Sequence, residues 1–489
     1  MSLADRAGQA MEKRFQLKQN GTTPAREAIA GMTTFFAMAY AIFVIPSTLA
    51  MAGTPDNPLP YGGVFLAVIL SSAAATLIMG LYANVPYALA PGIGLSSFLT
   101  FTVCGTLGFA WQEAFAMVFL CGLINLFITV TNIRKAILLA IPQELQIAIG
   151  GGIGVFIAYV GIKNAGFLSF TLNPGTFEIL DGAAVGDGSA VPALASFGSP
   201  EAFLSVAGFI LLTVFLLKKV RAAILLAILI VTALSLLTGI TSAADLSFTR
   251  GILQSFAELK LTFLAAFGSK GLGSLFSDAG RLPTVIMTVF AFSLSDIFDT
   301  IGMFLGTGRQ SGIFSDEEME QLQTRDKDHP GGRTKLEKAL FADACGTLAG
   351  SVLGCSNVTT YLESTAGIGA GGRTGLTSVA TAGLFLSCIL LSPLVALVPA
   401  QATAPVLIMV GIMMLSSFKR IDWTDLALAI PAFFAAIFMA LCYNISYGIA
   451  TAFIFHCITK MVMGQARDVS PVLWICSGLF VLNFVLLAL

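Results

Sequence analysis

The sequence contains little charge. Only 11% of its 489 residues are charged, whereas soluble domains carry about 25%. The formal net charge is −1, and no long run of one sign occurs. This balance gives no indication of a nucleic acid or an anionic surface as a partner. The low charge instead indicates a protein that lies in a membrane.

Several motifs are also missing. The sequence has no GxxxxGK[ST] phosphate loop, no cysteine–histidine spacing typical of a metal site and no nucleophile elbow. These absences argue against ATP-driven pumping and against a membrane enzyme. The eight cysteines show no paired spacing, so we interpret them as small packing residues. We therefore predict no enzyme activity, no cofactor and no metal.

Long apolar segments fill most of the chain. Hydrophobic residues make up 56% of the sequence, and the mean hydropathy is +0.88. Crossing a hydrocarbon layer of about 30 Å takes roughly 20 helical residues. After the last of the spans given in the next sentence, a further apolar segment, 472–489, forms either an additional span or a broken continuation of that last span. Windows of about 19 residues predict an all-helical polytopic protein with fourteen spans, near 31–52, 62–84, 86–104, 112–132, 142–162, 201–217, 221–242, 283–306, 336–354, 356–370, 376–398, 402–417, 424–443 and 446–464.

Lysine and arginine are concentrated in alternate connections, which indicates the cytoplasmic side of a plasma membrane. This pattern predicts a cytoplasmic N-terminus. Four basic residues in the connection between the seventh and eighth spans, Arg250, Lys260, Lys270 and Arg281, do not fit it, because the predicted topology places them on the external side of the membrane. Seven spans in each half would invert the second half relative to the first, as in transporters built from inverted repeats. We predict the following segments: a cytoplasmic N-terminal segment 1–27, a first repeat 28–242, a connection 243–282, a second repeat 283–464 and a C-terminal apolar segment 465–489.

The third and tenth predicted spans contain residues that interrupt a helix. The third has Pro86, Pro91, Gly92 and Gly94, and the tenth opens with β-branched and polar residues within Gly354–Gly367. Irregular backbone at membrane depth is tolerated only where it is buried in protein or lines a cavity. We therefore predict that both spans are broken and that both form walls of a substrate site.

Few ionisable residues lie inside the predicted spans, where each costs at least about 2.5 to 3.5 kcal/mol. Asp296 and Asp299 are three residues apart, on one face of a helix, and Glu363 lies in the broken tenth span. No lysine or arginine lies in the central parts of these spans. We interpret all three carboxylates as substrate-binding and proton-coupling groups, against the alternative of structural hydrogen bonding. Asp343, beside small residues, is interpreted first as a helix-packing residue.

Other candidates lie beside the breaks. Ser96, Ser97 and Phe98 follow the break in the third span, where unpaired backbone amides at the start of a half-helix could meet a substrate heteroatom. Phe98 and Tyr361 could stack on a flat ring, although an aromatic residue is more often part of a core. We include all four residues in the predicted substrate site.

Four motifs carry a resemblance to a known family over nearly the full length. They are Phe15–Pro24 leading into Gly31–Tyr40, Ala90–Ser96, Asp296–Gly302 and Tyr361–Gly375. Together they resemble the nucleobase-cation symporter-2 family, in its adenine/guanine/hypoxanthine permease branch. This branch usually has Asn where the chain has Ser96, which bears on the preference among purines.

The resemblance implies fourteen spans in two inverted sets of seven, arranged as a core domain and a gate domain that work by alternating access. It also implies that Asp296 or Asp299, together with Glu363, holds the base and responds to the proton. We therefore expect uptake of purine bases with protons, leaving sodium coupling and a homodimer open. An inorganic-anion or dicarboxylate carrier of related architecture is the alternative, and a passive channel is a third reading.

Overall fold

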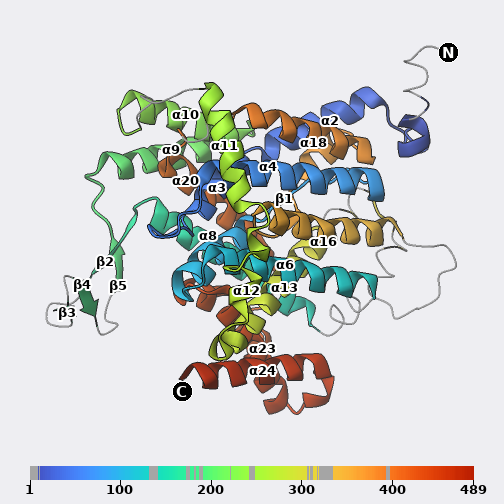
Figure 1. Cartoon of the computed structure of the whole chain (residues 1–489). Helices are drawn as coiled ribbons and strands as arrows, with labels where there is room; N and C mark the ends of the chain where they lie inside the picture. The colour runs from blue at the N-terminus through green and yellow to red at the C-terminus, as the bar shows by residue number, and fades with distance from the viewer. Residues whose placement is uncertain are drawn as a thin grey trace.

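The computed structural model describes residues 9, 11–131, 141–171, 177–180, 183–186, 191–220, 222–241, 248–304, 308, 312–315, 318, 334–391 and 397–488. Most of the described chain is helical (Figure 1). Two of the connections rich in lysine and arginine, on which the predicted orientation depends, are a loop around 325–338 and the pair Arg134 and Lys135. The loop lies largely outside the described residues, and the pair lies wholly outside them.

The first half contains α2 (Pro24–Met38), α3 (Ala41–Ala50), α4 (Tyr61–Ile78), η1 (Met79–Ala83), β1 (Leu89–Pro91), α5 (Ile93–Ser97), η2 (Phe98–Thr106), α6 (Trp111–Val130), α8 (Gln143–Asn164), β2 (Leu168–Thr171), β3 (Phe177–Leu180), β4 (Ala183–Gly186), β5 (Val191–Leu194), α9 (Pro200–Leu217) and α10 (Ala223–Leu237). The second half contains α11 (Phe248–Thr262), η3 (Ala265–Phe267), α12 (Leu272–Leu275), η4 (Ala279–Arg281), α13 (Leu282–Met303), α16 (Lys335–Leu353), β6 (Val358–Thr360), α17 (Ser364–Gly369), α18 (Gly375–Ser387), η6 (Cys388–Leu391), α20 (Ala400–Met414), η7 (Leu415–Arg420), α21 (Leu426–Phe433), η8 (Phe434–Phe438), α22 (Met439–Leu441), α23 (Ile445–Val462), η9 (Ala466–Asp468) and α24 (Pro471–Ala488).

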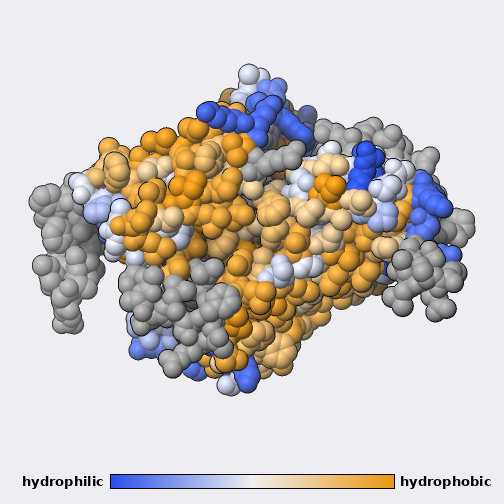
Figure 2. Space-filling model, turned by 90° about the horizontal axis from the view of Figure 1, so that it is seen from above, coloured by the Kyte–Doolittle hydropathy of each residue, from blue (hydrophilic) through white to orange (hydrophobic). Residues whose placement is uncertain are grey.

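Among the described residues, eight helices are long and apolar enough to cross a membrane by length and composition. They lie within Pro24–Ala50, Tyr61–Ala83, Trp111–Val130, Gln143–Asn164, Pro200–Leu217, Leu282–Ile301, Ala400–Arg420 and Ile445–Val462. Figure 2 shows a broad hydrophobic surface on the face that it presents. This surface and the helical bundle confirm the prediction of a helical membrane protein, although the described residues also include six short strands, β1 to β6. The count of fourteen spans stays a prediction.

Two features differ from simple uninterrupted spans. The first predicted span, 31–52, begins earlier and is divided into α2 and α3, with Ala39 and Tyr40 in a turn between them. Thr23 starts α2 because its hydroxyl accepts from the Arg26 amide at 3.3 Å, directly before Pro24. The apolar segment near 472–489 forms a separate helix, α24, which packs against α23 and α13.

A helix-capping pair fixes the start of α16, the helix that carries Asp343. The Thr334 hydroxyl accepts from the Glu337 amide at 3.1 Å, and the Glu337 carboxylate accepts from the Thr334 amide at 3.1 Å. The helix ends at Gly354, whose φ of 88° favours glycine. α16 packs against α4 and α6.

Candidate functional site

Two short strands from opposite halves of the chain form the centre of the candidate site. β1 pairs antiparallel with β6, with Leu89 opposite Thr360 and Pro91 opposite Val358. The helix α5 follows β1 after Gly92, and α17 follows β6. Each of the third and tenth predicted spans therefore contains an extended segment followed by a short helix, and the strand pairing places these two segments side by side.

Side chains satisfy the backbone around the strands. The Thr76 hydroxyl donates to the Leu89 carbonyl at 3.1 Å and accepts from the Leu89 amide at 2.9 Å. The Ser378 hydroxyl lies 2.7 Å from the carbonyl oxygens of both Val85 and Tyr87. Because unpaired backbone groups are costly in an apolar interior, these bonds allow extended backbone deep in the helical body.

Asp296 is buried and bonded to several donors, with a side chain that is 1% exposed. Its Oδ2 accepts from Asn125 Nδ2 at 2.8 Å, from the Thr347 hydroxyl at 3.2 Å and from Asn357 Nδ2 at 3.4 Å. The side-chain oxygen Oδ1 of Asn125 in turn accepts from the Ser293 hydroxyl. Asp296 thus joins α6, α13, α16 and the segment that leads into β6.

Asp299 lies in a different environment from Asp296. Asp299 lies deep in the helical body, with protein around it. Its side chain nevertheless has surface that solvent can reach. The Thr359 side chain lies close to Asp299, and Asp343 and Glu363 are close enough to interact electrostatically with it. Of the two aspartates, Asp299 is therefore the one that a solute could reach.

Asp343 is 2% exposed and connects neighbouring segments. Its Oδ2 accepts from the Thr300 hydroxyl at 2.8 Å, and its Oδ1 accepts from the Thr360 hydroxyl at 3.0 Å. These bonds attach α16 to α13 and to β6. They agree with the interpretation of Asp343 as a helix-packing residue.

Glu363 immediately precedes α17 and is partly exposed. Its Oε1 accepts from the Tyr40 hydroxyl at 2.5 Å, and Tyr40 itself is 2% exposed. In the part of the chain that the structure describes, no lysine or arginine forms a salt bridge with Asp299 or Glu363. Two accessible carboxylates therefore face the same region without an ion-paired cation among the described residues, and such a site can accept N–H donors from an uncharged solute.

The four neighbouring candidates are all buried. The Ser96 hydroxyl bonds to that of Ser356 at 2.5 Å, and its amide donates to the Gly92 carbonyl at 2.8 Å. The prediction of an unpaired backbone amide is therefore wrong for Ser96, because this amide bonds to the carbonyl of Gly92, the residue directly before α5. The Ser97 hydroxyl has no hydrogen-bond partner among the described residues.

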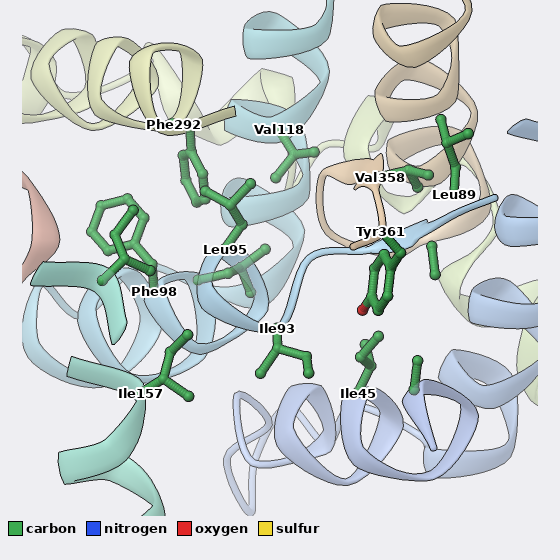
Figure 3. Packing of buried hydrophobic residues seen from close by; sticks show 14 of the residues in the cluster. Ile45, Leu89, Ile93, Leu95, Phe98, Val118, Ile157, Phe292, Val358 and Tyr361 are labelled. Carbon is green, nitrogen blue, oxygen red and sulfur yellow. The ribbon is translucent and has the colours of Figure 1, made fainter. Parts of the chain in front are cut away.

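The two predicted stacking residues lie in the hydrophobic core. Phe98 packs against Phe292, with 4.7 Å between ring centroids. The Tyr361 ring points toward Ile45 and Ile93 (Figure 3), and its hydroxyl donates to the Pro91 carbonyl at 2.6 Å. In this conformation both rings pack against protein, and stacking on a substrate stays a prediction.

Sequence reasoning missed the polar residues that hold the carboxylates. Tyr40, Asn125 and Asn357 contact Glu363 or Asp296. Asn125 was detectable as an amide in an apolar span, whereas the tyrosine could be identified only once α2 had been placed against α17. Among the described residues, no group of His, Cys, Asp and Glu side chains is arranged to hold a metal ion.

Comparisons with known proteins identify relatives over nearly the full length. A model of a permease family matches residues 25–451. The adenine permease AdeP of Escherichia coli (strain K12) is 34% identical over 98% of this chain and 97% of its own length. The guanine/hypoxanthine permease PbuG of Bacillus subtilis (strain 168) is 34% identical over 98% of this chain and its entire length. The relatives are thus transporters and not enzymes.

Solved structures share the fold at low sequence identity. The transmembrane domain of the cyanobacterial bicarbonate transporter BicA matches with a TM-score of 0.53 and 16% identity, over 89% of this chain and 96% of that domain. The structure of SLC26A9 matches with a TM-score of 0.55 and 12% identity, over 90% of this chain and 65% of that chain. The fold is that of inverted-repeat transporters. From the family match and the full-length relatives, the chain belongs to the nucleobase-cation symporter-2 family of permeases.

Proposed function

We propose that the chain takes up purine bases together with protons, by alternating access across the plasma membrane with its N-terminus in the cytoplasm. The observation that carries this proposal is the pair of accessible carboxylates, Asp299 and Glu363, beside the paired strands β1 and β6. A planar purine offers ring N–H and amino donors, which carboxylate oxygens accept. The names of the relatives, adenine and guanine/hypoxanthine permeases, support the same class of substrate.

The three acids have separate roles in this proposal. Asp299 and Glu363 hold the base, while Asp296 keeps the supporting helices together through Asn125, Thr347 and Asn357. Asp299 also interacts electrostatically with Asp343 and Glu363. Repulsion among neighbouring carboxylates is relieved when one of them binds a proton, which provides a way to couple base and proton. Ser96, Ser97, Phe98 and Tyr361 form the surrounding wall.

An anion carrier is the second candidate, because the matching folds include a bicarbonate transporter. That likeness concerns the fold alone. A site for sulfate or a dicarboxylate would be expected to present a cation or a cluster of backbone amides to the anion. The described residues instead place two carboxylates at the accessible position, and this arrangement would repel an anion.

The test measures uptake of radiolabelled hypoxanthine, guanine and adenine in cells that lack their own purine carriers, with and without a protonophore. We expect saturable uptake that the protonophore abolishes and that Glu363→Gln removes. Unlabelled purines should compete, whereas sulfate and dicarboxylates should not. Absence of purine uptake by the wild-type chain, with uptake of an anion instead, would support the second candidate.

A further inference from the structure

The helix α2 packs along α17, the half-helix that follows Glu363. Just after α2, in the turn before α3, the Tyr40 hydroxyl donates to Glu363 Oε1. In the first turn of α2, the Glu27 carboxylate accepts from the amides of Thr374 and Thr377 at 3.2 Å each, just beyond α17. Both ends of the α17 region are therefore attached to α2 or to the turn that follows it.

Close packing between these two attachments leaves little freedom. A methyl group added at Gly367 would meet the Thr34 side chain and the Ala30 carbonyl, so α17 lies directly against α2. Tyr40 lies in the turn between α2 and α3 and is 2% exposed. Burial on every side holds the phenol in one orientation, and its hydroxyl stays directed at one oxygen of Glu363.

We infer that Tyr40 is a positioning residue for purine recognition, which binds Oε1 of Glu363 so that Oε2 faces the base. This inference rests on the proposed function, in which Glu363 accepts an N–H group of the purine. Tyr40 need not touch the substrate. It determines the orientation of the carboxylate and thereby presents an acceptor, rather than an undirected charge, to the ring.

The orientation has a consequence for an amide at position 363. A tyrosine hydroxyl can donate or accept, but the Tyr40 hydroxyl bonds to no described residue other than Glu363. In Glu363→Gln its proton therefore still needs this acceptor, so the amide oxygen turns toward Tyr40 and the NH₂ group faces the base. The amide NH₂ group and the N–H group of the purine are both donors, so they cannot form a hydrogen bond with each other. Removing the hydroxyl as well allows the amide to rotate and to present its oxygen to the purine. The double variant should therefore bind purine better than Glu363→Gln alone.

The experiment compares Tyr40→Phe, Glu363→Gln and the double variant in the full chain. Hypoxanthine uptake gives KM and Vmax, and purine binding to the purified protein gives the affinity of variants that do not transport. The matched control is Tyr61→Phe, because the buried Tyr61 hydroxyl has no hydrogen-bond partner among the described residues. Both tyrosine variants remove one buried oxygen, but only Tyr40→Phe removes a bond to the carboxylate.

We expect Tyr40→Phe to raise KM about tenfold, with Vmax within about twofold of wild type, because it weakens binding of the base rather than movement of the protein. Tyr61→Phe should leave KM unchanged. In the Gln background, Tyr40→Phe should improve binding by about threefold or more, a gain that a purely structural role would not produce.

Two results would overturn the inference: a KM for Tyr40→Phe equal to that of Tyr61→Phe, or losses from the two single variants that simply multiply in the double variant. Either result leaves the proposed function intact. Failure of the wild-type chain to take up any purine would instead remove the proposed function itself.

Discussion

Replacing Asp296 and Asp299 one at a time with Asn separates a residue that supports the site from one that faces the ligand. Asp296 is 1% exposed and accepts bonds of 2.8, 3.2 and 3.4 Å on one oxygen. Asp299 is exposed. We expect Asp296→Asn to lower stability while purine binding survives, and Asp299→Asn to abolish binding while stability is kept.

The size of the stability effect follows from the bonds. A hydrogen bond to a charged group contributes about 1.5–3 kcal/mol and a neutral one about 0.5–1.5 kcal/mol, so an amide at position 296 loses roughly 1 kcal/mol for each good bond. With two short bonds and one long bond, the loss is about 2–3 kcal/mol. Unfolding entropy of about 2.1 cal/mol/K per residue makes each kcal/mol worth roughly 1 °C in a chain of this length. The melting temperature should therefore fall by about 2–3 °C.

Thermal unfolding of the purified protein in detergent, followed by intrinsic fluorescence, measures this difference, and binding of labelled hypoxanthine is measured on the same samples. Asp299→Asn is the matched control, with the same chemical change three residues away on the same helix, and its melting temperature should stay within about 1 °C of wild type. The reasoning is refuted if Asp296→Asn melts like wild type and fails to bind purine, or if both variants lose stability and binding equally.

Two further predictions concern the supports of the site. Glu27→Gln replaces a fully buried carboxylate that accepts from Arg373, Thr374 and Thr377. The amide would turn its NH₂ group toward some of these donors, which should lower the free energy of unfolding by roughly 3 kcal/mol and lower the melting temperature. An unchanged melting temperature would show that other contacts hold the segment that contains these three residues. Gly375→Ala should destabilise the protein by about 1–3 kcal/mol, because the new methyl group would meet the backbone of Gly80. Gly383→Ala in the same helix, where nothing lies within 4 Å, should be tolerated, and equal melting of the two variants would contradict this reading.

The overall architecture was accessible from the sequence because its signals are local. Runs of apolar residues predicted the helices. Prolines and glycines around Pro91 and Gly92 predicted an interruption of the third span, in a region where the structure has β1 and α5; that this region is a broken membrane span stays a prediction. The carboxylates were conspicuous because few charges occur in apolar spans. The division of the first span at Tyr40 was not predicted, since no glycine or proline occupies the turn itself.

Other parts of the site depend on contacts between distant segments, which periodicity does not report. Asp296 and Asp299 look equivalent in sequence, and only the placement of Asn125 and Asn357 shows which one is enclosed. The partner of Glu363 lies in the first predicted span. A single sequence contains no local signal for such a pairing.

The pairing of β1 with β6 also has a consequence for how the protein is made. Leu89 and Thr360 come from opposite halves of the chain, so the strand that begins the site is synthesised long before its partner. Until residue 360 has been added, the backbone of β1 lacks this partner in an apolar surrounding. Such long-range pairing forms slowly and late. The first half should therefore wait in the membrane in an incomplete state, and this interval is when the nascent protein is most exposed to misassembly and degradation.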